Sequence, residues 1–104
     1  MNRNALESML NRGNDNAMLR YTLGLVCFKE KDFTAAVEHL EIALEQESNH
    51  SASWKLYGKT LTKLERYEDA EMAFDKGIDN ALSQGDIQAA KEMKVFLKRL
   101  HKAA

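Results

Sequence analysis

The amino-acid sequence repeats itself at an offset of 34 residues. Small residues return at small positions, since Gly24 aligns with Gly58 and Ala36 aligns with Ala70. Large apolar positions also return, in the pairs Phe33 and Tyr67, Leu40 and Phe74, Cys27 and Leu61, and Leu44 and Ile78. A period of this length with two helical stretches per unit is typical of a solenoid of helix-turn-helix repeats. Such arrays present surfaces to partners and rarely perform chemistry.

Apolar periodicity and turn residues predict helices throughout a single all-α domain, and the chain contains no proline to interrupt them. We expect helices at about residues 3–11, 17–30, 33–46, 52–64, 67–82 and 87–101. Lys31 and Asp32 form a tight turn, Gly85 ends the fifth helix at a positive φ, and Asp86 caps the last. The domain spans residues 1–104, with a capping helix and turn (1–16), two repeats (17–50 and 51–84) and a C-terminal capping helix (85–104).

The residues at fixed offsets within each unit resemble a known family. The second unit reads Trp54-x-x-Tyr57-Gly58-x-x-Leu61, then Tyr67 and Ala70-x-x-x-Phe74, and the first reads Arg20-x-x-Leu23-Gly24-x-x-Cys27, then Phe33 and Ala36-x-x-x-Leu40-x-x-Ala43. This pattern is similar to that of the tetratricopeptide repeat (TPR) family. Arg20 departs from the family's tryptophan, and Ser48 and Leu82 stand where the family usually has proline. The resemblance covers residues 17–84 and implies a right-handed α-α superhelix whose first helices line a concave groove.

The two ends of the chain are predicted to close the array. Leu6 lies 34 residues before Leu40, so the first helix reads as the truncated second helix of a degenerate preceding repeat. The last helix carries one apolar stripe, made of Ile87, Ala90, Met93, Leu97 and Leu100. Lysines and Arg99 cover the rest of that helix. A terminal helix with a polar outer face is what a solenoid needs at its end.

Catalytic or metal chemistry is not expected. Cys27 falls at a core position of the repeat and reads as a small buried hydrophobe. The histidines are not spaced as metal ligands, and there is no phosphate-binding glycine loop. The carboxylates Glu38, Glu41 and Glu45 have the helical spacing of a solvated face. We therefore expect no enzyme activity, no cofactor and no metal.

Overall composition sets limits on partners and location. The 15 basic residues nearly balance the 16 acidic ones, so no net charge directs the chain to nucleic acid or to a membrane. The first residues do not form an apolar run long enough for a signal peptide, and no stretch approaches the roughly 20 apolar residues of a membrane span. One cysteine cannot form an internal disulfide, which suits a reducing compartment. We expect a cytoplasmic protein.

Charge is segregated by helix. The helix at 52–64 carries Lys55, Lys59 and Lys63 without an acid, whereas the second helices of both repeats are acidic. The resemblance therefore implies a basic groove and an acidic convex face. The groove side of the helix at 17–30 instead carries an apolar stripe. The candidate groove residues are Met18, Tyr21, Leu25, Phe28, Lys55, Lys59, Thr62 and Lys63. Two alternatives stay open: the lysines merely keep a helix soluble, or a terminal helix covers the stripe.

The expected function is non-catalytic binding of a protein, either an acidic or amphipathic peptide or a partner helix, in the concave groove. The carboxylate clamp of some TPR domains is absent, because its positions hold Tyr21, Leu25, Leu56, Asp86 and Ala90. The alternatives are a self-assembling scaffold and a dissociable regulatory subunit of a larger enzyme or complex. The expected state is a monomer or weak homo-oligomer.

Overall fold

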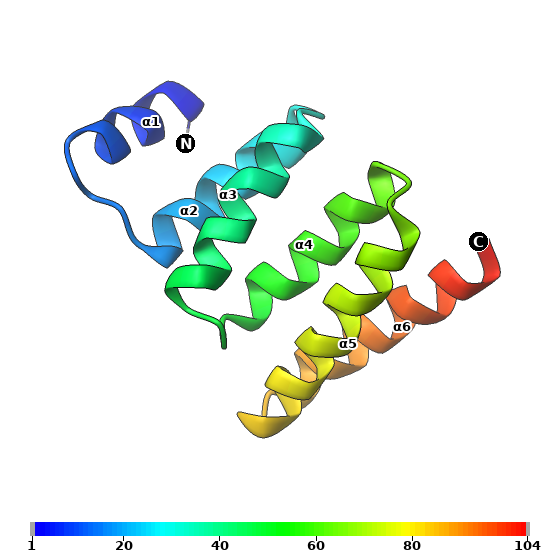
Figure 1. Ribbon diagram of the computed structural model, residues 1–104. Helices are drawn as coiled ribbons and strands as arrows, with labels where there is room; N and C mark the ends of the chain where they lie inside the picture. Colours follow the sequence, from blue (N-terminus) through cyan, green and yellow to red (C-terminus); the bar gives the residue numbers. More distant parts are fainter. Residues whose placement is uncertain (1, 104) are drawn as a thin grey trace.

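The computed structural model describes residues 2–103, which form six helices and no strand. These are α1 (Arg3–Asn11), α2 (Ala17–Lys29), α3 (Phe33–Gln46), α4 (Ser51–Lys63), α5 (Tyr67–Ser83) and α6 (Ile87–Ala103). Each begins and ends within two residues of its expected position. The helices follow one another in chain order along an array of 41 × 29 × 20 Å, with α1 at one end and α6 at the other (Figure 1). The all-α helical-repeat fold is thus confirmed.

The turn between the two helices of a repeat has the same backbone in both repeats. Lys31 and Glu65, 34 positions apart, both adopt left-handed conformations, with φ of 64° and 59°. The next residue donates its amide to a carbonyl five residues earlier, Asp32 to Cys27 and Arg66 to Leu61, at 2.9 Å in each case. Non-glycine residues rarely adopt this conformation, so the recurrence reflects the geometry of the turn rather than residue preference.

Polar side chains cap the beginnings of α2, α3, α4 and α6, whereas α5 begins after Arg66 without a side-chain cap. Asn16, Asp32 and Asp86 each accept a hydrogen bond from the backbone N–H three residues later, at 2.9, 3.3 and 3.1 Å. His50 accepts one from Ser53 N–H in the same way. These bonds satisfy amides that have no partner within the helix. Gly85, with φ of 76°, lets the chain reverse before Asp86, as expected.

The helices form two rows. Within residues 2–103, the backbone of α4 lies close to those of α2 and α6, whereas the backbones of α3 and α5 stay farther apart. Helices that approach one another on one side and diverge on the other produce a curved array. We call the side formed by α2, α4 and α6 the concave face, and the side formed by α3 and α5 the convex face.

Glycine sets the closeness of the two helices in each repeat. A Cβ atom at Gly24 would lie 2.8 Å from Leu40 Cγ, and one at Gly58 would lie 2.5 Å from Phe74 Cε1. Both partner side chains are almost fully buried. The expected close approach at the repeated glycines is therefore confirmed.

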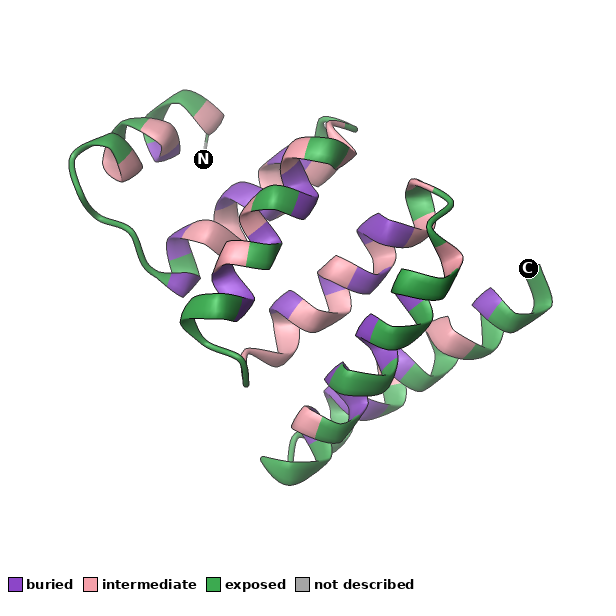
Figure 2. Cartoon of the chain, in the orientation of Figure 1, coloured by how far each residue is buried: buried purple, intermediate pink, exposed green. Residues whose placement is uncertain are grey.

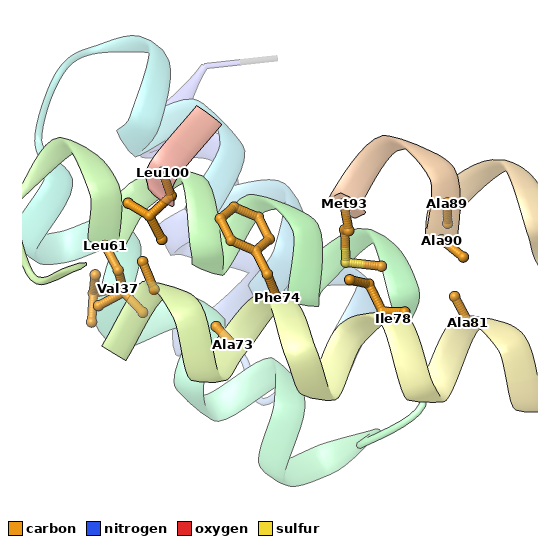
Figure 3. Packing of buried hydrophobic residues seen from close by; sticks show 11 residues of the cluster. Val37, Leu61, Ala73, Phe74, Ile78, Ala81, Ala89, Ala90, Met93 and Leu100 are labelled. Carbon is orange, nitrogen blue, oxygen red and sulfur yellow. The ribbon is translucent and has the colours of Figure 1, made fainter. Parts of the chain in front are cut away.

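Both ends of the array are closed by helices. Leu6 of α1 is 1% exposed and packs against Leu19 and Leu23 of α2. At the other end, Met93 and Ala90 of α6 face Ile78 and Ala81 of α5 (Figure 3). Leu100 belongs to the same cluster, which extends to Phe74, Leu61 and Val37.

The predicted apolar stripe on α6 is wrong at one residue, Ile87. Ile87 is 52% exposed, because it opens the helix at the turn, before the helix packs against α5. The buried stripe begins with Ala89 and Ala90 instead. Buried residues elsewhere lie along the sides where the helices face one another, and the outward side of α5 is exposed (Figure 2). No helix within residues 2–103 has the length and apolar character to cross a membrane.

Candidate functional site

The apolar stripe of α2 is not covered by either terminal helix. Leu6, Met9 and Leu10 of α1 pack against Leu19, Leu23 and Val26, which lie outside the stripe. Among the described residues, α6 makes no contact with α2. Met18 is 61% exposed, and Tyr21, Leu25 and Phe28 are half-buried.

The two aromatic residues of the stripe have different neighbours. Phe28 packs edge-on against Phe33, with ring centroids 5.4 Å apart. Tyr21 lies against His50 at the start of α4, at 5.3 Å between ring centroids. The structure therefore places Phe28 near the end of α2 and Tyr21 beside the cap of the next repeat. Each aromatic residue of the stripe therefore makes a contact of its own. Leu25 stands between Tyr21 and Phe28 in the sequence.

The candidate residues of α4 also differ from one another. Lys55 Nζ lies 3.1 Å from Glu92 Oε1 of α6, so its charge is paired within the chain. Thr62 donates its hydroxyl hydrogen to the Gly58 carbonyl at 2.8 Å, so that hydroxyl serves its own helix. Lys63 is exposed.

Lys59 lies between aromatic rings from the two flanking helices. Its Nζ is 5.5 Å from the Phe28 centroid and 5.2 Å from the Phe96 centroid. A cation at this distance from a ring face is attracted by the ring quadrupole. The contact brings the predicted residues Phe28 and Lys59 together across α2 and α4.

Sequence reasoning missed the contribution of α6 to this face. Phe96 supplies the second ring beside Lys59, and the Arg99 guanidinium lies 5.8 Å from the Phe96 centroid. The same region is hollowed into a cavity of about 360 Å³, whose wall includes Lys59, Lys63, Phe74, Phe96, Arg99 and Leu100. The available signal was the repeat itself, because Phe96 lies 34 positions after Thr62 and 68 after Phe28, both predicted groove residues.

Positive charge on this cavity is not neutralised by the described chain. Within residues 2–103, no ion pair involves Lys59, Lys63 or Arg99. The acidic side chains of α3 and α5 lie mostly exposed on other surfaces, namely Glu38, Glu41, Glu45, Glu68, Asp69, Glu71, Asp75 and Asp79. The concave face therefore offers unpaired cations beside aromatic surface.

The cysteine and the three histidines are engaged in structural contacts within the fold. Cys27 is fully buried, and its burial raises the pKa of the thiol. His50 caps α4, His101 contacts Glu71, and His39 lies 3.1 Å from an Arg20 nitrogen. Burial, followed by the charge of Arg20, lowers the pKa of His39.

Cys27 is therefore expected to react slowly with an aromatic disulfide reagent in the folded protein and quickly in denaturant. The thiolate is the reactive form, and both burial and the raised pKa disfavour it. The rate of thiol labelling at constant pH, with and without denaturant, measures this. Native labelling as fast as that of free cysteine would reopen a redox role for the thiol.

Comparison with known proteins assigns the family. The family model described as anaphase-promoting complex, cyclosome, subunit 3 matches residues 4–77. The TPR repeat-containing protein PA0015 of Pseudomonas aeruginosa is 43% identical over 98 residues, which span 94% of this chain and 93% of that protein. The chain belongs to the tetratricopeptide repeat family.

Solved structures show the same TPR fold. The solution structure of protein BPP2914 from Bordetella parapertussis is 40% identical, with a TM-score of 0.88 over 99% of this chain and 90% of that one. A TPR2B-domain:pHsp70 complex of yeast Sti1 gives a TM-score of 0.91 at 15% identity, over 98% of this TPR chain and 82% of that one. The second likeness concerns the fold alone. TPR folds generally mediate protein–protein interactions.

Proposed function

We propose that this TPR protein is a non-catalytic interaction module that binds a peptide or a partner helix on its concave face. The binding residues are Met18, Tyr21, Leu25, Phe28, Lys55, Lys59, Thr62 and Lys63. The observation that carries this proposal is the position of Lys59, between Phe28 and Phe96 and outside every ion pair within residues 2–103. A partner that buries the aromatic surface must also place a negative charge near Lys59. The proposed site of action is the cytoplasm, where a lone thiol stays reduced.

In such a site, apolar side chains and charged side chains contribute to different properties of binding. Burial of aromatic side chains supplies most of the affinity, at about 25 cal/mol for each Å² of apolar surface removed from water. Complementary charge speeds the encounter and sets its salt dependence. The partner segment that fits has an acidic side and an apolar side, either as an amphipathic helix or as an extended peptide.

Lys59→Glu is expected to weaken partner binding and to reduce its sensitivity to salt, because it reverses the attraction. Phe28→Ala is expected to weaken binding with little change in salt sensitivity, because it removes apolar contact area. The partner is first captured from the cell of origin and mapped by cross-linking and mass spectrometry. Its affinity for each variant is then measured across a salt series.

Lys94→Glu is the matched control, since it makes the same charge reversal at an exposed position of α6. It is expected to leave the affinity nearly unchanged. Binding that is indifferent to both Lys59→Glu and Phe28→Ala, or cross-links confined to α3 and α5, would reject the concave face as the site. Light scattering of the purified protein tests the alternative of self-assembly, which predicts a stable oligomer without any partner.

A further inference from the structure

The cavity between α4 and α6 has a composition that restricts what can occupy it. Phe96 provides accessible apolar surface beside the buried Phe74 and Leu100, and Lys59, Lys63 and Arg99 provide positive charge. No acidic residue lines it. An apolar side chain alone would leave the cations without a counter-charge, and a free anion would leave the rings exposed. A suitable ligand combines a carboxylate with apolar groups.

The apolar surface lies on both sides of the central cation. Phe28, on α2, is on one side of Lys59, and Phe96, on α6, is on the other. A ligand that uses both sides therefore needs one apolar group before its carboxylate and one after it. An acidic residue inside a segment meets this requirement, whereas a chain-terminal carboxylate has residues on one side only.

The spacing of these groups favours a helical ligand. The ammonium group lies 5.5 Å and 5.2 Å from the two ring centroids. Side chains three or four residues apart on a helix lie about 5–6 Å apart at their Cβ atoms. Residues two apart on an extended strand share a face at about 6.5 Å, a looser match.

We propose that the cavity lined by Lys59, Lys63 and Arg99 binds an Asp or Glu side chain of a partner's amphipathic helix, with large apolar residues three or four positions before and after that acid. This proposal rests on the proposed function and specifies the partner's chemistry at that face. The carboxylate pairs with the cations, while the two apolar side chains cover Phe28 on one side and Phe96 on the other.

The first test uses a defined probe, an acetylated and amidated helical peptide on an Ala and Gln host. The peptide carries one central glutamate, with a leucine four positions before it and another four positions after it, so that all three side chains share one helix face. Titration into ¹⁵N-labelled full-length protein is followed by NMR. Shift changes are expected around Lys59, Phe96 and Arg99. Replacing the peptide's glutamate with glutamine is expected to weaken binding about fivefold, the equivalent of roughly 1 kcal/mol for exposed ion pairing.

Two further peptides separate the sources of the carboxylate and the shape of the ligand. One has glutamine at the central position and a free C-terminal carboxylate after a leucine. The other keeps the acid but contains a central proline that prevents a continuous helix. Tighter binding of either than of the amidated acidic helix would overturn the proposal, as would equal binding of the glutamate and glutamine helices.

Reversing the charge on both the protein and the peptide separates a loss of direct ion pairing from a loss of binding caused by misfolding. Arg99→Glu is expected to weaken binding of the glutamate peptide and to improve binding of the corresponding lysine peptide. Lys98→Glu, an exposed neighbour that does not line the cavity, is the control and is expected to change neither affinity by as much as about twofold. Loss of the glutamate peptide without any gain for the lysine peptide would contradict direct pairing.

The outcomes distinguish this inference from the proposed function. If no probe peptide binds while the natural partner still depends on Phe28 and Lys59, the cavity proposal fails and the interaction face stands. If the peptides bind as expected while the natural partner is cross-linked to the convex face, the cavity is a real site and the proposed function of the concave face fails.

Discussion

Removal of residues 86–104 is expected to make the protein aggregate or unfold at room temperature. Ala89, Ala90, Met93 and Leu100 are at most 8% exposed and belong to the largest core cluster. Their loss would expose Phe74, Ile78 and Ala81 of α5 (Figure 3). Burial of each large apolar side chain contributes roughly 1.5–3 kcal/mol, against a total stability of about 5–15 kcal/mol for a domain. The truncation therefore removes a large share of the stability.

Removal of residues 102–104 alone is the matched control, because Lys102 and Ala103 are exposed. That shorter truncation is expected to leave the melting temperature nearly unchanged. Circular dichroism reports the helix content of both truncated proteins, and size-exclusion chromatography with light scattering reports their mass. A monomeric 1–85 chain that melts like the full protein would show that α6 is an appendage rather than a structural cap.

The parts of the fold that repeat were predictable from the sequence. Gly24 and Gly58 recur because the two helices of each repeat approach closely at that point, and a Cβ there would clash with Leu40 or Phe74. The same periodicity placed Cys27 and Leu61 in the core, and both are fully buried. The helix boundaries were predictable because capping side chains and turn residues mark them locally.

The contribution of α6 to the candidate site was only partly predictable, because α6 keeps the period at Phe96, 34 positions after Thr62, but departs from the repeat elsewhere. Glu92 stands 34 positions after Gly58. The glycine position faces the second helix of its own repeat, and within residues 2–103 α6 has no such partner. A large acidic residue is therefore tolerated there, and it pairs with Lys55. That pairing depends on how α6 is rotated against α4.

Contacts between repeats were also hidden from a single-sequence reading. A Cβ atom at Gly77 would lie 2.5 Å from Met93 Sδ and 2.7 Å from Trp54 Cβ. Gly77 thus allows α4, α5 and α6 to meet, but it has no counterpart one period away, where Ala43 stands. Similarly, the contact of Tyr21 with His50 joins two repeats through side chains that the periodic pattern does not pair. Periodicity predicts contacts between residue types that recur in every repeat, and the residue types of these two contacts do not recur at an offset of 34.

Gly58→Leu is expected to destabilise the protein by about 1–3 kcal/mol or more, because it overpacks the contact between α4 and α5. A Cβ atom would lie 2.5–2.7 Å from three carbons of the Phe74 ring, and that ring is 1% exposed. Replacing a helical glycine gains about 1 kcal/mol of helix propensity. The clash opposes and exceeds that gain. Lys63→Leu, at an exposed site of the same helix, is the control and is expected to change stability little.

A double-mutant cycle tests whether the Phe74 ring is the cause. The first repeat places Leu40 opposite its glycine, where the second places Phe74. Phe74→Leu shortens the opposing side chain, so Gly58→Ala is expected to cost less in that background than in the native protein. Urea unfolding of the four proteins gives the coupling free energy, which for residues in contact is about 0.5–3 kcal/mol. Additive effects in this cycle, or a Gly58→Leu variant with the melting temperature of the native protein, would mean that Gly58 does not face Phe74 across the helix pair. The 34-residue alignment of the two repeats would then be wrong at this position.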